Sequence, residues 1–142
     1  MHRYPDTPII GVGGIVLKGD SILLVKRGNP PGKGCWGVPG GCLELGETLK
    51  EGVAREVREE CGIEVEVGDL FDVFEVFEED DQGTMEFHYV ILDFLARHSS
   101  GTPKSGDDAD ECRFIPFDII WEQNLTPGVV ELLKRMDKKG ML

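Results

Sequence analysis

The chain has 142 residues, of which 40% are hydrophobic and 30% charged, a composition typical of a globular protein large enough to bury a core. Its formal net charge of −12 argues against nucleic acid and anionic membranes as docking partners, because either would be repelled. No apolar run approaches the roughly 18 residues of a membrane span, and residues 1–8 lack the apolar segment of a signal peptide. We therefore expect one domain over residues 1–142, located in the cytoplasm.

The four cysteines are Cys35, Cys42, Cys61 and Cys112. They show neither a C-x-x-C pair nor the His-flanked spacing of a zinc site. We expect buried free thiols, as in a protein of a reducing compartment.

The first part of the chain predicts extended structure broken by turns. Residues 9–17 and 22–27 are apolar runs joined by the turn sequence KGDS, which indicates a β-hairpin. Residues 29–34 (NPPGKG) hold too much proline and glycine for regular structure. A short extended piece at residues 35–39 then leads to a pair of glycines and a loop.

Residues 49–61 are predicted to form a helix. Thr48 and Glu51 have capping-box spacing at its start, and Gly62 provides a left-handed stop. At about 100° per residue, three glutamates project into a single arc beside an apolar one. These are Glu56, Glu59 and Glu60.

The glutamate arc has two interpretations. Like charges at i,i+3 and i,i+4 each cost a few tenths of a kcal/mol, and a divalent cation would remove that cost. Oxygen ligands favour Mg²⁺ or Mn²⁺. The helix alone equally allows a solvated acidic face balanced by Arg55 and Arg58.

Further strands are expected after this helix. Residues 64–67 and 70–77 alternate polar and apolar side chains, as one strand or as two with a slip. Residues 85–96 are the longest strand candidate, with a centre apolar enough to be buried on both faces. Residues 107–111 form an acidic loop, and residues 114–120 a short strand.

A last helix is expected near the end of the chain. Thr126 is placed to cap it, with Pro127 at its first position. The β-rich pattern with one central and one late helix predicts an α+β or layered αβα domain.

Residues 41–63 resemble the Nudix box, G-x5-E-x7-R-E-U-x-E-E-x-G-U, where U is an aliphatic residue. All nine specified positions match, which is far more specific than a lone glycine motif. The segments NPPGKGCWGVPGG and HYVILDFLA resemble ADP-ribose-pyrophosphatase-like members of this family, so the resemblance covers roughly residues 9–136. It implies an α+β fold: a Nudix αβα sandwich with a mixed β-sheet, the box helix on one side and a C-terminal helix on the other.

The resemblance also implies a reaction: metal-dependent hydrolysis of a nucleoside diphosphate linked to another moiety, by water attacking phosphorus. The flanking similarity favours ADP-ribose, cleaved to AMP and ribose 5-phosphate. The ADP-ribose subgroup often carries a proline about fifteen residues after the box, whereas residues 77–80 here are FEED. Hydrolysis of an oxidised or normal nucleoside triphosphate to monophosphate and pyrophosphate therefore stays open. A non-catalytic nucleotide-sensing module is a third reading, although such modules typically lose box carboxylates.

Site residues follow from the resemblance position by position. The family's metal ligands, three carboxylates and often a backbone carbonyl, match Glu56, Glu59, Glu60 and Gly40. Arg55 and Glu47 match a supporting pair in which the arginine holds the carboxylates and loop in register.

The catalytic base has two kinds of candidate. Glu59 is the choice within the box. Glu111 is the choice outside it, and could instead be an extra metal ligand. Asp107, Asp108 and Asp110 compete for that role, and an ordinary acidic loop is the alternative for all four.

Substrate contacts are expected from Arg27, Lys33 and Trp36. Arg27 matches a position where related proteins contact phosphate, although a surface charge is the alternative. Lys33 could reach a phosphate from its loop, and Trp36 could stack a base or lie in the core. For His88, a hydrogen-bonded or solvent-facing side chain is favoured over a catalytic one. The expected partner is a small nucleotide, and the sequence leaves a homodimer open.

Overall fold

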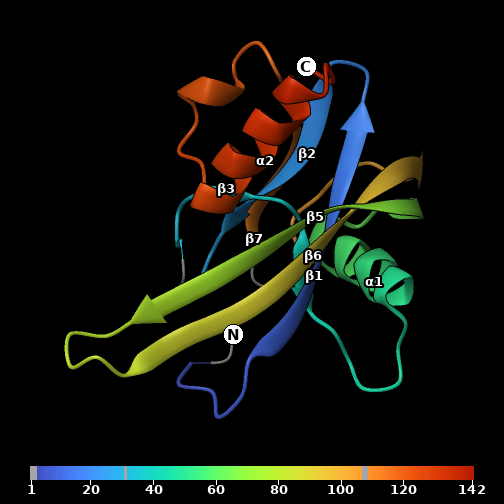
Figure 1. Ribbon diagram of the computed structural model, residues 1–142. Helices are drawn as coiled ribbons and strands as arrows, with labels where there is room; N and C mark the ends of the chain where they lie inside the picture. Colours follow the sequence, from blue (N-terminus) through green and yellow to red (C-terminus); the bar gives the residue numbers. More distant parts are fainter. Residues whose placement is uncertain (1–2, 31, 107–108) are drawn as a thin grey trace.

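The computed structural model describes residues 3–30, 32–106 and 109–142. Within those ranges seven strands form one mixed sheet with a long helix on each face (Figure 1). The strands are β1 (Ile9–Lys18), β2 (Ser21–Arg27), β3 (Trp36–Gly37), β4 (Gly40–Cys42), β5 (Glu64–Glu79), β6 (Met85–Ser100) and β7 (Ala109–Pro116). The helices are α1 (Leu49–Cys61), α2 (Pro127–Lys138) and the 3-10 turn η1 (Ile120–Glu122). The predicted αβα sandwich is confirmed.

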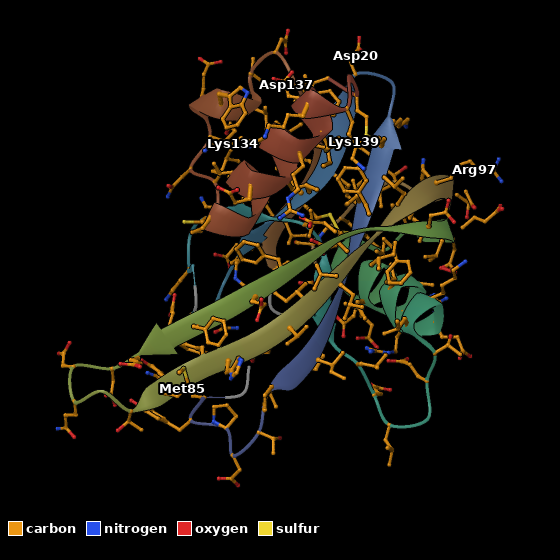
Figure 2. All side chains as sticks on the ribbon, viewed as in Figure 1. Asp20, Met85, Arg97, Lys134, Asp137 and Lys139 are labelled. Atoms are coloured by element: carbon orange, nitrogen blue, oxygen red, sulfur yellow. A yellow bond between two sulfur atoms is a disulfide. The ribbon has the colours of Figure 1, made fainter. Side chains whose placement is uncertain are left out.

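The sheet runs in the order β3-β2-β1-β6-β5, with β4 also paired to β1 and β7 to β2. The central pair β1–β6 is parallel, and the other pairs are antiparallel. β5 and β6 form a long hairpin, and Met85 marks the start of β6 near its tip (Figure 2). In the part of the chain that the structure describes, no helix is long and apolar enough to cross a bilayer.

Helix α1 begins and ends where its capping signals predict. Thr48 accepts a hydrogen bond from the Glu51 backbone and Glu51 returns one, while Gly62 adopts φ 68°. The buried side of α1 packs on β1 at Gly14, where an added Cβ would lie 3.0 Å from Val57. The core on this face of the sheet contains Val12, Val16, Val53, Val57, Ile63 and Phe94.

Helix α2 covers the opposite face. The Thr126 hydroxyl accepts a hydrogen bond from the Val129 N–H at its start, as predicted. The exposed side chains of Lys134 and Asp137 lie along its outer side (Figure 2). The core on this face contains Ile15, Ile22, Leu24, Leu132, Leu133 and Met136.

Three strands depart most from the predictions. β4 occupies residues expected to be loop, because Gly40 pairs with Gly13 of β1, where a Cβ on Gly40 would lie 2.3 Å from a β1 carbonyl oxygen. β6 continues beyond residue 96 because β5, a single strand with register shifts, pairs with it along its whole length. β7 begins at Ala109 because it pairs with β2, so part of the expected acidic loop is strand. It ends at Pro116, so the expected strand over residues 114–120 is wrong at its end, where a turn leads into η1.

The expectation of free thiols throughout is wrong for one pair. Cys61 at the end of α1 and Cys112 in β7 form a disulfide, with Cα atoms 5.7 Å apart. The two cysteines are 51 positions apart in sequence and meet only because α1 packs beside β7. Cys35 and Cys42 are free thiols as expected, but each is only partly buried.

We expect reduction of this disulfide to lower the free energy of unfolding by about 4 kcal/mol, because the bridge closes a long loop in the unfolded chain. Urea unfolding of the wild type with and without reductant measures the difference. A variant lacking only the two free thiols, Cys35→Ala/Cys42→Ala, should respond to reductant as the wild type does. The Cys61→Ala/Cys112→Ala variant should not respond. An unfolding midpoint of the wild type that ignores reductant would contradict the prediction.

Candidate functional site

A cavity of about 770 Å³ lies where α1, β4 and the centre of the sheet meet. Its walls come from β1, the end of β2, β4, α1, β5, β6 and the start of α2. All three glutamates of the predicted metal site line it, as do Gly40 and Gly41. The helix arc recognised in the sequence therefore faces a hollow in the molecule.

Arg55 ties the loop before α1 to the helix. Its Nε and Nη2 lie 2.8 and 2.7 Å from the two carboxylate oxygens of Glu47, and Nη2 also donates to the Cys42 carbonyl oxygen at 3.0 Å. Its side chain is 17% exposed, so these contacts are partly shielded from water. The planar guanidinium suits this two-point pairing.

The same arginine also contacts the glutamate arc. Arg55 Nη1 lies 2.7 Å from Glu56 Oε1 and 3.2 Å from Glu59 Oε2. Glu60 is held from the other side, because the Gly40 N–H donates to its Oε1 at 2.6 Å. A Cβ on Gly41 would lie 2.5 Å from the Glu56 carboxylate, so the glycine allows close approach of the loop.

The hydrogen bonds between Arg55 and Glu47 shift the pKa of Glu47. The bonds that Arg55 donates are the largest of the effects that together lower this pKa to about 2. The carboxylates in turn raise the already high pKa of Arg55 further. Both groups are therefore charged throughout the neutral range.

We expect the Glu47–Arg55 pair to contribute to acid sensitivity. The folded pKa of Glu47 is about 2, below the roughly 4.3 of a free glutamate, so its contribution to stability is present above about pH 4.5 and is lost as the pH falls towards 2. Urea unfolding at a series of pH values should show a smaller acid loss for Glu47→Gln than for the wild type. The matched control is Glu66→Gln, at an exposed strand position, which should keep the acid loss of the wild type. Parallel pH curves for the Glu47→Gln variant and the wild type would contradict the assignment.

The donor chemistry at the glutamate arc fits a hard divalent cation. Three carboxylates from one helix line the same cavity, and oxygen is the ligand that Mg²⁺ and Mn²⁺ prefer. Within residues 3–30, 32–106 and 109–142, no group of three His, Cys, Asp or Glu side chains is already arranged to hold a metal ion. Arg55 and the Gly40 N–H donate hydrogen bonds to these carboxylates and hold them in position. Gly40 contacts Glu60 through its N–H. Metal binding by the Gly40 carbonyl oxygen stays a prediction.

The predicted substrate residues fall in different environments. Arg27 lines the cavity at the end of β2. Lys33 is exposed and is absent from the described cavity lining. Trp36 is 5% exposed in the α2-side core, with the Arg113 guanidinium 5.0 Å above its ring. Of the two roles expected for Trp36, base stacking or a place in the core, its position matches the core. His88 is half-buried beside Phe77, with ring centroids 4.4 Å apart.

The acidic residues proposed outside the box are Glu111, Asp107, Asp108 and Asp110. Glu111 is in β7, exposed, with its Oε2 3.4 Å from Arg113 Nη2, and it is absent from the described cavity lining. Asp110 is exposed in the same strand. Asp107 and Asp108 lie outside the described residues. Of the two candidate bases, the described cavity lining therefore contains Glu59 and does not contain Glu111.

Sequence reasoning missed Asp93, which lines the cavity from β6 and is 6% exposed. One signal was available. Asp93 interrupts the apolar run VILDFLA, which is predicted to be buried, and a buried carboxyl needs a partner.

Comparison with known proteins identifies the family of this chain. The family model described as NUDIX domain matches residues 7–136. An ADP-ribose pyrophosphatase of Methanocaldococcus jannaschii is 41% identical over 83% of this chain and 66% of its own, so the chain spans just under two thirds of that relative. A MutT-like protein of Streptomyces ambofaciens is 33% identical, over 96% of this chain and 82% of its own.

Solved structures agree in fold. The MutT NUDIX hydrolase from Burkholderia pseudomallei superposes with a TM-score of 0.80 at 30% identity, covering 92% of this chain and 98% of that one. The match of the family model over nearly the whole chain, with the box on α1, shows that this protein belongs to the Nudix hydrolase family.

Proposed function

We propose that the protein hydrolyses ADP-ribose to AMP and ribose 5-phosphate with Mg²⁺ or Mn²⁺. The observation that carries the proposal is the convergence of Glu56, Glu59 and Glu60 on one cavity. The name of the M. jannaschii relative supports the choice of substrate, because that protein is an ADP-ribose pyrophosphatase.

The cation would be held by the three glutamates and the Gly40 carbonyl. When bound, it would supply positive charge that offsets the charge of the diphosphate. Arg55 would keep the carboxylates in position through its hydrogen bonds to Glu56 and Glu59. Arg27, which lines the same cavity, would contact a phosphate oxygen.

Glu59 would act as the general base. Its side chain is 43% exposed and lines the cavity, so a water molecule can reach it, whereas Glu111 is paired with Arg113 outside the described lining. In the reaction the water oxygen bonds to phosphorus, its proton passes to the Glu59 carboxylate, and the bridging P–O bond breaks. The bridging oxygen leaves with the second product.

The partner on this proposal is a small nucleotide. The net charge of −12 still argues against nucleic acid. A homodimer, a cytoplasmic location and a single domain over residues 1–142 stay predictions from the sequence.

A product-resolved panel tests the proposal. ADP-ribose, other nucleotide sugars, dinucleoside polyphosphates, and normal and oxidised nucleoside triphosphates are each incubated with Mg²⁺ or Mn²⁺. We expect AMP and ribose 5-phosphate from ADP-ribose. If only triphosphates are cleaved, to monophosphate and pyrophosphate, ADP-ribose is not the substrate. If compounds bind but none is cleaved, the protein is a nucleotide-sensing module.

A further inference from the structure

Asp93 is a buried carboxyl group at the cavity that the catalytic proposal does not use. It lies in the middle of β6, between Gly13 of β1 and Asp72 of β5 in the strand ladder. It is 6% exposed, and it lines the same cavity as the glutamate arc. Its position differs from that of the box glutamates, because it belongs to the sheet and not to α1.

The Asp93 carboxyl has no protein partner at one oxygen. Its Oδ1 is buried without a hydrogen bond among the described residues. A Cβ on Gly13 would lie 2.3 Å from that oxygen, so the carboxyl group occupies space that the neighbouring glycine leaves open. Asp72, its cross-strand neighbour, is equally buried but is bonded to Arg135 of α2. One carboxyl of this pair is thus satisfied within the protein, and the other lines the cavity unsatisfied.

The surroundings of Asp93 make this arrangement unfavourable without a ligand. The cavity nearby is lined by apolar side chains, including those of Val38, Ile91 and Phe74. Burial, followed by the charge of Asp72, raises the pKa of Asp93 to about 7. A buried polar atom without a partner is destabilising, and a ligand in the cavity that donates a hydrogen bond to the Asp93 carboxyl group, which lines it, would offset part of that cost.

The strand ladder relates Asp93 to the loop that contacts the glutamate arc. Gly13 pairs with Asp93 on one side and with Gly40 on the other, and the Gly40 N–H binds Glu60. Two ladder steps of roughly 4.8 Å separate the Cα atoms of Asp93 and Gly40 by about 10 Å. The Asp93 carboxyl group lies over Gly13, between these two Cα atoms. A nucleoside whose phosphate is held at the glutamate arc can therefore extend to Asp93. A phosphate is unsuited to the Asp93 end, because the carboxyl group carries no positive charge and repels a phosphate when it is ionised.

We propose that Asp93 accepts a hydrogen bond from an amino group of the substrate's nucleobase and thereby selects bases that carry such a donor. The proposal rests on the proposed function only in that the substrate is a nucleotide. A sugar hydroxyl offers the same donor chemistry from a second source, so the test separates base from sugar.

Equilibrium binding tests this role without catalysis. Isothermal titration calorimetry in the presence of Mg²⁺ compares AMP, purine riboside 5′-monophosphate, which lacks the amino group, and ribose 5-phosphate. We expect the wild type to bind AMP about tenfold or more tightly than purine riboside 5′-monophosphate. Asp93→Leu should lose this preference by weakening AMP alone, whereas Asp93→Asn, which keeps an acceptor oxygen, should retain most of it.

The matched control is Asp72→Asn, which alters the neighbouring buried carboxyl outside the described cavity lining and should keep the preference for AMP. Thermal melting checks that each variant is folded. The role of Asp93 is overturned if the wild type binds the two purine nucleotides equally, if AMP does not bind, or if Asp93→Leu binds AMP as the wild type does. Loss of ribose 5-phosphate affinity in Asp93→Leu would also overturn it, in favour of a sugar contact. Because these ligands are not hydrolysed, a preference for AMP survives even if the panel assigns a different nucleotide substrate.

Discussion

Replacing Glu56 or Glu60 by glutamine is expected to lower turnover by about 100-fold or more while leaving the fold intact. The amide has nearly the same shape as the carboxylate but lacks its charge, so it is a poor ligand for a hard cation. Loss of groups that merely orient ligands typically costs 10–100-fold, and loss of a ligand should cost at least as much. Both side chains line the cavity, where this charge would be needed.

The control for these variants is Glu64→Gln. Glu64 follows the same helix but is exposed and paired with the exposed Arg58, so its substitution should leave turnover near that of the wild type. Rates are measured across a titration of Mg²⁺, and Mn²⁺ binding is followed by electron paramagnetic resonance. A near-normal rate together with unchanged Mn²⁺ affinity in either variant would remove that residue from the metal site. A variant that fails to melt cooperatively would instead indicate a structural role.

The elements best predicted from the sequence are those with local signals. Both ends of α1 follow from the Thr48–Glu51 capping box and the glycine stop, and the start of α2 follows from Thr126 and Pro127. These signals act within a few residues and do not depend on the rest of the fold. Helical spacing likewise predicts that three glutamates share one arc, and the structure places that arc at a cavity.

The features that escaped the sequence depend on distant partners. β4 exists only because β1 offers glycines for close pairing, and β7 extends to Ala109 because β2 lies beside it. The Cys61–Cys112 disulfide joins positions whose spacing carries no signal. The placement of Asp93 required the β1–β6 register, which a parallel pair of distant strands does not reveal in sequence.

The Nudix box predicts the class of reaction but not the substrate. The box indicates where a diphosphate would be bound and says nothing of the attached group, since much of the remaining cavity wall comes from β1, the end of β2, β5, β6 and α2. Trp36 illustrates the difficulty, because an aromatic residue beside a glycine-rich loop suits either stacking or the core, and the packing of α2 places it in the core. Substrate choice therefore belongs to residues that tertiary structure brings to the cavity.

The second large effect is expected for Arg55→Lys. The guanidinium makes two bonds to Glu47, one to the Cys42 carbonyl oxygen, and one each to Glu56 and Glu59. Lysine keeps the charge but is a point donor that cannot span these acceptors. We expect the free energy of unfolding to fall by about 2 kcal/mol, because partly buried carboxylates lose their partners. Turnover should fall at least tenfold, because Glu56 and Glu59 lose the group that positions them.

Arg58→Lys, three residues along the same helix, is the matched control. Arg58 is 57% exposed and pairs only with Glu64 in the described ion pairs, so its substitution should change stability by less than about 0.5 kcal/mol. Urea unfolding and steady-state rates are measured for both variants under the same conditions. Equal, small effects would mean that the Arg55 contacts are a surface network. A large loss of turnover without loss of stability would contradict the expected stability loss and leave only the positioning of Glu56 and Glu59.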